Sequence, residues 1–376
     1  MKKIVTFIIL TFIFITGITF NQTGTEIKVK ASSNDSELAK SLYSAVQRGD
    51  LEDVRELISK GADVNWLSYM GNTPLLVSVK NRDLAITRLL IQTGVYDLET
   101  PLMVAVDSGY EEEIELLIDA GAQLNIRRPS GYPVFVDAVH TRNERIVQMF
   151  IDAGVNINIA TDYGLNALIA AAEEGYTSIV QILINAGAQQ GKTTALCEAV
   201  YGYNVKIVKL LIKEGANYNI QDRYGNTLLI DAIDKNYLEI ARILIDVGIV
   251  KQDEALWESA THNNIEITKL LIAAGADFRR RNPDSYGQTP LIATVEVGYL
   301  QMAKLLIDAG ARLEVEDNYG YTPLICASIN GDKDMVHLLI DEGADIHHIN
   351  KDGETALYHA KRMSNHEIVD ILKDAE

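Results

Sequence analysis

The most regular feature of the chain is an apolar helical pattern that stops at a glycine. Leu57 and Ile58 come before Gly61, and a similar apolar cluster comes before Gly94. Eight further glycines follow the same kind of cluster, at positions 121, 154, 187, 215, 248, 275, 310 and 343. The successive spacings are 33, 27, 33, 33, 28, 33, 27, 35 and 33 residues. A period of this length is typical of a protein built from stacked structural repeats.

Each repeat is predicted to hold two helices. Glycine suits the end of the second helix, because a C′ residue in the left-handed conformation carries no penalty there. Threonine followed by proline suits the start of the first helix, as N-cap and first helical residue. Segments of this kind open at Thr73, Thr100, Thr289 and Thr322, with weaker versions at Thr194, Thr227 and Thr355. A short turn such as Glu174-Gly175-Tyr176 joins the two helices.

Thr-Pro-Leu together with Gly61-Ala62-Asp63-Val64-Asn65 resembles the signatures of the ankyrin repeat. Eleven such units can be counted from Glu37 to the end of the chain. The resemblance implies an all-α ankyrin-repeat solenoid of about eleven helix-turn-helix units, with β-hairpin fingers at the junctions. The short spacings after Gly94, Gly187 and Gly248 predict three shortened fingers, which leaves seven full ones at ten junctions.

The chain departs from the family pattern at one position. The family has a histidine after Thr-Pro-Leu that is hydrogen-bonded between repeats. Here apolar residues take its place, at Leu76, Met103, Ile292 and Ile325. This change predicts apolar packing in place of polar ties between repeats.

The first residues of the chain have the pattern of an export signal. Lys2 and Lys3 precede an apolar run from Ile4 to Phe20, and a small residue stands at Ala31. This order is expected of a secretory signal. We therefore expect a signal peptide at residues 1–31, with an uncleaved membrane anchor as the alternative, a short linker at 32–36 and the solenoid at 37–376. The protein would be exported, to a secreted, periplasmic or cell-surface location, and the Ile, Lys and Asn content suggests a bacterial source.

Composition and motifs argue against catalysis and against nucleic acid. The formal charge is −18, whereas phosphate binding requires clustered Lys and Arg. Residues 186–193 match a relaxed phosphate-loop pattern, but a helix precedes them instead of a strand. His347 and His348 have acidic neighbours and are expected to be loop residues. Cys197 and Cys326 are expected to be free, buried thiols. We therefore predict no enzyme activity, no cofactor, no metal and no small-molecule substrate.

The remaining function is recognition of another protein. In the family, the concave face is built from the fingertips and the exposed side of each first helix. Carried over by position, and by the preference of interfaces for aromatic anchors, the predicted partner-binding residues are Trp66, Tyr69, Asp107, Tyr132, Tyr163, Glu173, Glu174, Tyr201, Tyr224, Asp234, Tyr286, Glu296, Tyr319 and Tyr321. The acids among them favour a partner with a basic surface. We expect a monomeric scaffold or adaptor; the alternative is an acidic inhibitor or immunity-type protein that blocks one enzyme or toxin.

Overall fold

The computed structural model describes residues 18–20, 26–28, 33–283 and 285–376. The chain divides into two compact units, unit 1 up to Ala167 and unit 2 from Leu168 to Glu376, and each is described by itself. Two short strands, β1 (Ile18–Phe20) and β2 (Glu26–Lys28), pair antiparallel before the repeats. Most of the predicted signal segment lies outside the described residues.

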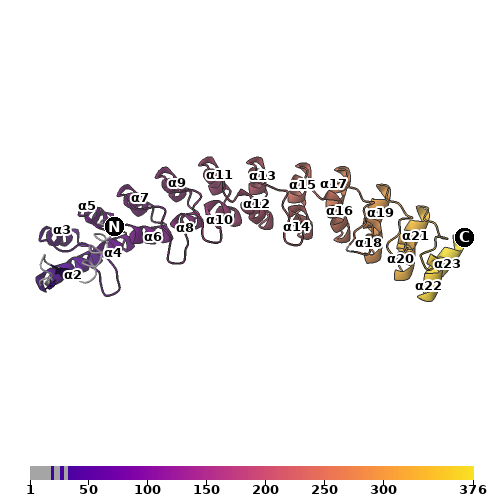
Figure 1. Cartoon of the computed structure of the whole chain (residues 1–376), viewed down its shortest axis with the longest axis horizontal. Coiled ribbons are helices and arrows are strands. Elements are labelled where there is room, and N and C mark those ends of the chain that lie inside the picture. The colour runs from indigo at the N-terminus through magenta and orange to yellow at the C-terminus, as the bar shows by residue number, and fades with distance from the viewer. Residues whose placement is uncertain (1–17, 21–25, 29–32, 284) are drawn as a thin grey trace. The chain divides into compact units, whose positions relative to one another are not determined.

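The described part of the chain contains 22 helices arranged in consecutive antiparallel pairs (Figure 1). Unit 1 contains α2 (Ser33–Arg48), α3 (Leu51–Ser59), α4 (Pro74–Lys80), α5 (Leu84–Gln92), α6 (Glu99–Ser108), α7 (Glu111–Asp119), α8 (Val134–His140) and α9 (Glu144–Asp152). The boundary falls at the start of α10 (Ala167–Glu173). Unit 2 continues with α11 (Thr177–Asn185), α12 (Lys192–Tyr201), α13 (Val205–Lys213), α14 (Leu228–Asp234), α15 (Leu238–Asp246), α16 (Gln252–Thr261), α17 (Ile265–Ala273), α18 (Pro290–Val297), α19 (Leu300–Asp308), α20 (Pro323–Asn330), α21 (Lys333–Asp341), α22 (Ala356–Arg362) and α23 (His366–Asp374).

These helices form eleven pairs, so the all-α class and the eleven units are confirmed. The first pair begins earlier than the pattern indicated. Helix α2 starts at Ser33 and not at Glu37, so most of the segment expected to be a linker is helical.

The glycine at the end of the second helix adopts the predicted conformation. At Gly121 φ is +91°, and the Gly121 N–H donates to the Ile118 carbonyl. The Ala122 N–H donates to the Leu117 carbonyl, which completes the pair of bonds of a Schellman motif. The repeat spacing therefore follows from where each second helix must end.

Fingers occur at seven junctions and are shortened at three, as predicted. Hydrogen bonds close each full finger, for example from the Asp222 N–H to the Asn226 carbonyl at 2.9 Å. The loops before α4, α8, α10 and α14 project as fingers in Figure 1, whereas the loops before α6, α12 and α16 are brief. Those three helices have ten residues each, compared with seven or eight in the first helices that follow a full finger. A longer helix thus takes up part of the missing finger.

This lengthening corrects two predicted helix starts. Thr100 and Thr194 lie inside the first turns of α6 and α12, whose N-cap positions are Leu98 and Gly191. At Thr100 the N–H donates instead to Asp97 Oδ1, at 2.9 Å. Thr73, Thr289, Thr322 and Thr355 do act as N-caps, each accepting from the backbone N–H three residues later.

The junctions share one hydrogen bond that is made in two ways. Where a repeat opens with a full finger, the finger carries the acceptor for the next junction: Asn125 Oδ1 accepts from the Asn156 N–H at 2.8 Å. Asn65, Asn219 and Glu314 make the equivalent contact at three other junctions. Where the finger is short, the acceptor lies at the start of the lengthened helix, and these acceptors are Glu99, Thr193 and Asp253. The lengthened helix therefore preserves the polar tie that the shortened loop would lose.

A second set of polar ties corrects the expectation that apolar packing replaces them. Asn204 Nδ2 donates to the Ala172 carbonyl at the end of the preceding first helix, at 3.3 Å. Asn264 makes the same contact with the Ile233 carbonyl at 2.8 Å, and Asn365 with the Ser328 carbonyl at 3.1 Å. The inter-helix turns, and not the Thr-Pro-Leu segments, therefore supply hydrogen bonds between repeats.

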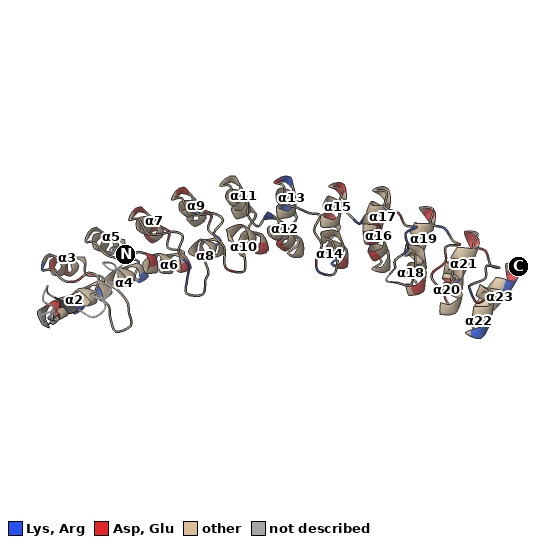
Figure 2. Ribbon diagram, in the orientation of Figure 1, with Lys and Arg blue, Asp and Glu red and all other residues tan. Residues whose placement is uncertain are grey.

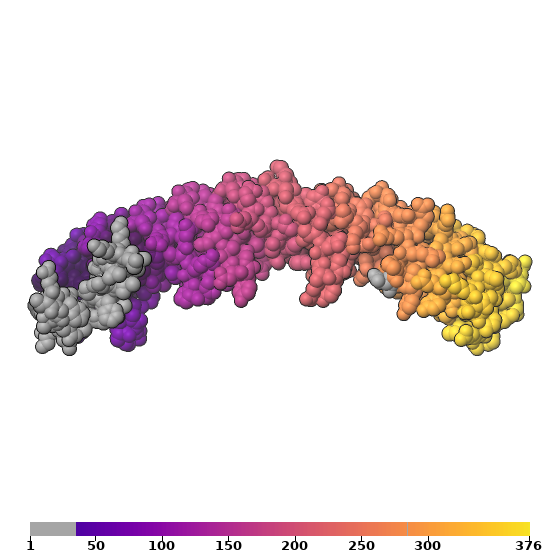
Figure 3. All heavy atoms as spheres, viewed as in Figure 1, coloured from indigo at the N-terminus to yellow at the C-terminus, as the bar shows by residue number. Residues whose placement is uncertain are grey.

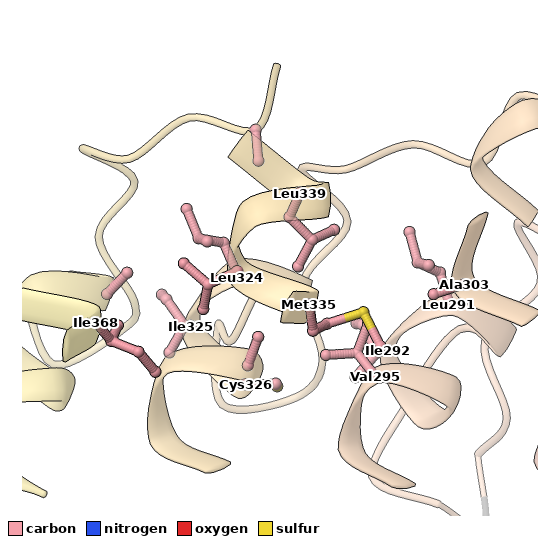
Figure 4. Close-up of a cluster of buried hydrophobic side chains, with 14 of the residues drawn as sticks. Leu291, Ile292, Val295, Ala303, Leu324, Ile325, Cys326, Met335, Leu339 and Ile368 are labelled. Atoms are coloured by element: carbon pink, nitrogen blue, oxygen red, sulfur yellow. The ribbon is translucent and has the colours of Figure 1, made fainter. Parts of the chain in front are cut away.

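Each core is shared between neighbouring helix pairs. Figure 4 shows Leu291, Ile292 and Val295 of α18 near Met335 of α21, with Leu324 to Cys326 of α20 alongside. Ile292 and Ile325, two of the residues that replace the family histidine, are buried here. Lys40, Arg48 and Lys373 of the two terminal repeats are exposed.

Glu113 is an exception within the core of unit 1. It occupies the third position of its helix, where Ile86 and Ile146 stand in the neighbouring repeats. Its side chain is buried, and neither carboxylate oxygen has a hydrogen-bond partner. The nearest cation is Arg82, whose Nε lies 3.8 Å from Glu113 Oε1. A buried carboxylate with so little compensation opposes folding.

Replacing Glu113 by Ile is therefore expected to stabilise the protein by about 1–3 kcal/mol, since an apolar residue of similar size fits the site. Urea denaturation followed by circular dichroism measures the change. The control is Glu112→Ile at the exposed neighbouring position, which we expect to alter stability by less than about 0.5 kcal/mol. A destabilised Glu113→Ile variant would contradict this account of the buried carboxylate.

Candidate protein-binding surface

Acidic side chains gather on the first helices of unit 2. Figure 2 shows Asp and Glu on α10, α14, α16 and α18. We use the name acidic face for six residues of the first four repeats of this unit. They are Glu173 of α10, Glu198 of α12, Asp222 of the finger before α14, Asp231 and Asp234 of α14, and Glu258 of α16.

The carboxylates of the acidic face crowd one another. Burial raises the pKa of Glu198, and the charge of Glu173 raises it further. Burial also raises the pKa of Asp231, with Asp222 as the next cause. Glu258 follows the same pattern, since burial and then Asp234 raise its pKa against the opposing effect of His262. Partly buried like charges at this spacing make the ionised face unfavourable until a cation approaches.

Tyr201 is the hydrogen-bond partner of Asp231 within this face. That bond lowers the pKa of Asp231, but burial and Asp222 outweigh it. Burial, followed by the charge of Asp231, raises the pKa of Tyr201 in turn. Cys197 lies on the same helix, and burial raises its pKa to about 11, so the thiol stays protonated at neutral pH. Cys197 and Cys326 are both free thiols as predicted, but Cys197 is only half-buried.

In unit 1 the equivalent acids are paired with an arginine. Arg128, on the finger before α8, lies between Asp107 of α6 and Asp137 of α8. Its Nε is 2.6 Å from Asp137 Oδ2, and a second guanidinium nitrogen bonds Asp107. Asp107, one of the predicted binding residues, is therefore already paired. No Lys or Arg within the described part of unit 2 forms such an ion pair with the acidic face, where His262 approaches Asp234 and Glu258 only to 3.7 Å.

The predicted fingertip aromatics fall into three groups. Trp66 is half-buried and packs edge-to-face on Tyr43 of α2 at 5.5 Å, so it supports the first repeat. Tyr69, Tyr163 and Tyr224 are strongly exposed and Tyr132 is less so. Arg223 lies over the Tyr224 ring at 4.7 Å.

The third group forms a tyrosine ladder, made of Tyr286, Tyr319 and Tyr321. Tyr286 and Tyr319 have ring centroids 5.7 Å apart, and Tyr319 and Tyr321 are separated by 5.9 Å. His359 extends the row, 5.4 Å from Tyr321. Tyr286 and Tyr319 remain more than half exposed despite this stacking. Rings that are held by each other lose little freedom on binding, which suits an interface.

The structure places the remaining predicted residues on exposed helix ends. Glu173, Glu174, Asp234 and Glu296 are exposed, and Tyr201 is partly so. Sequence reasoning missed the other acids of the face. Glu198, Asp231 and Glu258 stand three residues before Tyr201, Asp234 and Thr261, the residues that end α12, α14 and α16. Residues three apart share a helix face, so these acids could have been predicted by looking three residues before each helix end.

Two groups of side chains have the composition of a cation site. Asp234, Glu258 and His262 form the first, and Glu314, Asp345 and His348 the second, with ligand atoms within 4.8 Å. In the second group Glu314 and Asp345 already accept backbone N–H groups. In the first, His262 Nδ1 lies 2.8 Å from the Glu258 carbonyl oxygen. Much of the ligand capacity of both groups is therefore used within the fold.

The relaxed phosphate-loop pattern is part of an ordinary junction. Helix α11 precedes it, and Gly191 caps α12 in the left-handed conformation. Lys192 Nζ donates to Gln189 Oε1 at 3.0 Å and to the Glu214 carbonyl at 2.9 Å. The lysine that would contact phosphate is therefore engaged within the repeat. Within the described ranges, no helix is both long and apolar enough to cross a bilayer.

Comparisons with known proteins agree on the repeat. A family model described as "Ankyrin repeats (3 copies)" matches residues 42–128, 128–193, 185–255, 256–350 and 314–376. The Arabidopsis thaliana potassium channel AKT2/3 is 32% identical over 32% of this chain and 15% of its own length. A putative ankyrin repeat protein of fowlpox virus, FPV022, is 24% identical over 63% of this chain and 30% of its own length.

One further curated protein and one solved structure are similar to this chain. Human transient receptor potential cation channel subfamily A member 1 is 23% identical over 73% of this chain and 24% of its own length. A crystal structure of an ankyrin repeat domain from Acinetobacter baumannii is 29% identical, with a TM-score of 0.44, over 48% of this chain and 96% of that one. The chain spans less than a third of the length of each of the three curated relatives described. These three come from a plant, a virus and an animal, which gives no support to the expected bacterial source.

The crowding of the acidic face predicts a specific pH dependence for Asp231→Asn. Because folding raises the pKa of Asp231, the ionised carboxylate opposes folding above that pKa. The effect vanishes once the group is protonated in both states, below the unfolded value of about 3.9. Asp231→Asn should therefore stabilise the protein at pH 7, by a few tenths of a kcal/mol since the site is half exposed, and leave it unchanged near pH 3.

Urea denaturation at pH 7, 5 and 3 measures this difference. Asp137→Asn in unit 1 is the matched control, because it removes an ion pair with Arg128 and should destabilise the protein at pH 7. If Asp231→Asn lowered stability as much as Asp137→Asn does, the carboxylate of Asp231 would be compensated in the folded protein, and the prediction would be wrong.

Proposed function

Because the chain belongs to the ankyrin-repeat family, we propose that it is a non-enzymatic scaffold that binds another protein through the acidic face and the fingertips of unit 2. Ankyrin repeats mediate binding of protein partners. A row of stacked repeats presents an extended surface instead of an enclosed pocket. That geometry favours recognition of a macromolecule over chemistry on a small substrate.

The observation that carries the proposal is the different treatment of acids in the two units. Arg128 neutralises Asp107 and Asp137, whereas burial and neighbouring acids raise the pKa values of Glu198, Asp231 and Glu258. Among the described residues no Lys or Arg forms an ion pair with these three acids. Lys and Arg side chains of a partner would relieve this crowding on binding. Complementary charge of this kind also speeds association and selects against acidic partners.

The tyrosine ladder supplies the apolar part of the surface. Tyr286, Tyr319 and Tyr321 offer large contact area, and their hydroxyl groups are available to hydrogen-bond with a partner. Together the two regions match the usual division of an interface into aromatic anchors and a charged periphery.

We place the protein outside the cytoplasm, as a monomer. Lys2, Lys3 and the apolar run from Ile4 to Phe20 have the order of a secretory signal, and Ala31 supplies a cleavage site. Cleavage there releases the repeat region, whereas retention of residues 1–31 anchors it to the membrane. Sequencing the N-terminus of the mature protein distinguishes the two.

An inhibitor of one enzyme or toxin with a basic surface is the second candidate, and the acidic face favours it as well. A pull-down from the exported fraction separates the two functions. A single stoichiometric enzyme favours inhibition, whereas several structural proteins favour scaffolding.

Reversing two charges of the acidic face, together with that of the neighbouring Glu174, tests the proposal. The triple variant Glu173→Lys, Glu174→Lys, Asp234→Lys should weaken binding of the recovered partner at least about a hundredfold, because attraction becomes repulsion at three sites. Calorimetry or surface plasmon resonance measures the affinity, and circular dichroism should show an unchanged helix content.

The matched control places the same charge change on the second helices of unit 2, as Asp246→Lys, Asp308→Lys, Asp341→Lys. All three positions are exposed and lie at the ends of α15, α19 and α21, where a lysine suits the helix dipole. If both variants lose affinity equally, the effect is one of overall charge and not of the acidic face. If the first variant loses no affinity, the acidic face is not part of the interface.

A further inference from the structure

Neighbouring full fingers of unit 2 are joined by main-chain hydrogen bonds. The Asn318 N–H donates to the Tyr286 carbonyl at 2.8 Å. The Lys351 N–H donates to the Tyr319 carbonyl at 3.4 Å in the same way. Each finger therefore accepts, through the carbonyl of its tyrosine, one hydrogen bond from the finger that follows.

The glycine after each tyrosine confirms how closely these fingers approach. A Cβ added to Gly320, where φ is +84°, would lie 2.7 Å from the Lys351 nitrogen. A Cβ on Gly287 would overlap Asn318 Oδ1. At the equivalent Gly225 the nearest atom is Lys251 Nζ, 3.8 Å away. The side of this finger that faces the next repeat is therefore covered only by a flexible side chain.

The finger that should cover Gly225 is missing, because the junction after Gly248 is one of the three short ones. Among the described residues no N–H donates to the Tyr224 carbonyl, the equivalent of the Tyr286 and Tyr319 carbonyls. Lys251 Nζ donates to the adjacent Gly225 carbonyl at 3.2 Å and pairs with Glu254 at 2.9 Å. One acceptor of the finger edge is thus left open.

A cavity of about 210 Å³ occupies the position of the missing finger, and we name it the finger slot. Tyr224 to Asn226 form one wall and Arg280 to Pro283 the other, with Lys251, Glu254 and Trp257 of the α16 region between them. Figure 3 shows the projecting finger of residues 221–227 and a recess beside it, on the side of the higher-numbered residues.

The dimensions of the slot suit one strand. Stacked helix pairs lie about 8–10 Å apart, so the fingers on either side of an omitted one lie about 16–20 Å apart, which leaves room for one extended segment and its side chains. A single strand between two strand edges needs about 9–10 Å, twice the usual strand spacing. Trp257 forms an aromatic floor, and its indole N–H is buried without an acceptor. Tyr224 is 74% exposed with Arg223 over one face of its ring, so an incoming ring would stack on the other face, as Tyr286 stacks with Tyr319.

We propose that the finger slot binds an extended segment of the partner protein, which replaces the missing finger by main-chain pairing with Tyr224 and by stacking of an aromatic side chain on its ring. Strand addition of this kind gives affinity through the main chain and specificity through alternate side chains. The inference rests on the proposed function, since it names how a protein partner would engage unit 2.

A peptide copied from the protein's own finger is the probe. The segment Glu316 to Thr322 contains the Asn318 N–H that pairs with the Tyr286 carbonyl, so the same contact is available at Tyr224. The acetylated, amidated peptide is titrated into the full chain labelled with 15N at tryptophan. The chain has two tryptophans, and the indole signal of Trp257 should shift saturably.

Two controls make the titration decisive. A peptide N-methylated at the asparagine corresponding to Asn318 cannot donate and should bind about threefold to tenfold more weakly. A protein variant with six residues of the 314–323 finger inserted between Val250 and Lys251 restores the 33-residue spacing and should abolish the shift. A Trp257 signal that does not move at millimolar peptide, or equal binding of the methylated peptide, would overturn the finger slot.

The two proposals fail separately. A silent titration rejects the slot, while weaker partner binding after charge reversal would still support the acidic face. Conversely, a Trp257 shift together with unchanged affinity of the charge-reversed variant would uphold the slot and reject the acidic face.

Discussion

Two short helices cannot bury their apolar sides against each other alone, so each pair depends on the pairs beside it. Leu324 and Ile325 of α20 are buried because α18 and α22 cover them. Stability therefore depends on the junctions, and the hydrogen bonds found there serve the same end. Where a finger is present its loop carries the acceptor, and where it is shortened Glu99, Thr193 or Asp253 takes over. The fold can thus omit fingers without losing the contact that orients the next repeat.

Because the repeats are held together by apolar packing and these ties, the ends of the first helices are available for other interactions. In unit 1 Arg128 uses that freedom to join two acids of adjacent repeats. In unit 2 burial raises the pKa values of Glu198, Asp231 and Glu258, and the charges of Glu173, Asp222 and Asp234 respectively raise them further. The omitted finger has a similar consequence, since no N–H of the described residues donates to the Tyr224 carbonyl. Both features cost the free protein some stability and both favour a bound state.

Periodicity was enough to predict most of the fold. The glycine stops count the repeats, because only a left-handed residue ends each second helix in the required way. Local motifs were less reliable. Thr100 and Thr194 look like N-caps, but where the loop is shortened the helix starts before them. Ties such as Asn264 to the Ile233 carbonyl join residues 31 apart, which no local pattern reveals. At the surface, the exposed helix ends were predictable by position, whereas the stacking of Tyr286 on Tyr319 depends on the approach of two fingers in space.

The central claim is that repeats with a full finger and repeats with a shortened one tie the next repeat by the same hydrogen bond, from different acceptors. Native-state hydrogen exchange measures this directly at the donors. The amides of Gln123, Asn217 and Asp277, whose acceptors lie on lengthened helices, should be protected to the same degree as those of Asn156, Val250 and Asp345, whose acceptors lie in full fingers. Exchange of the first three at the rate of an unstructured peptide, with the second three protected, would contradict the account.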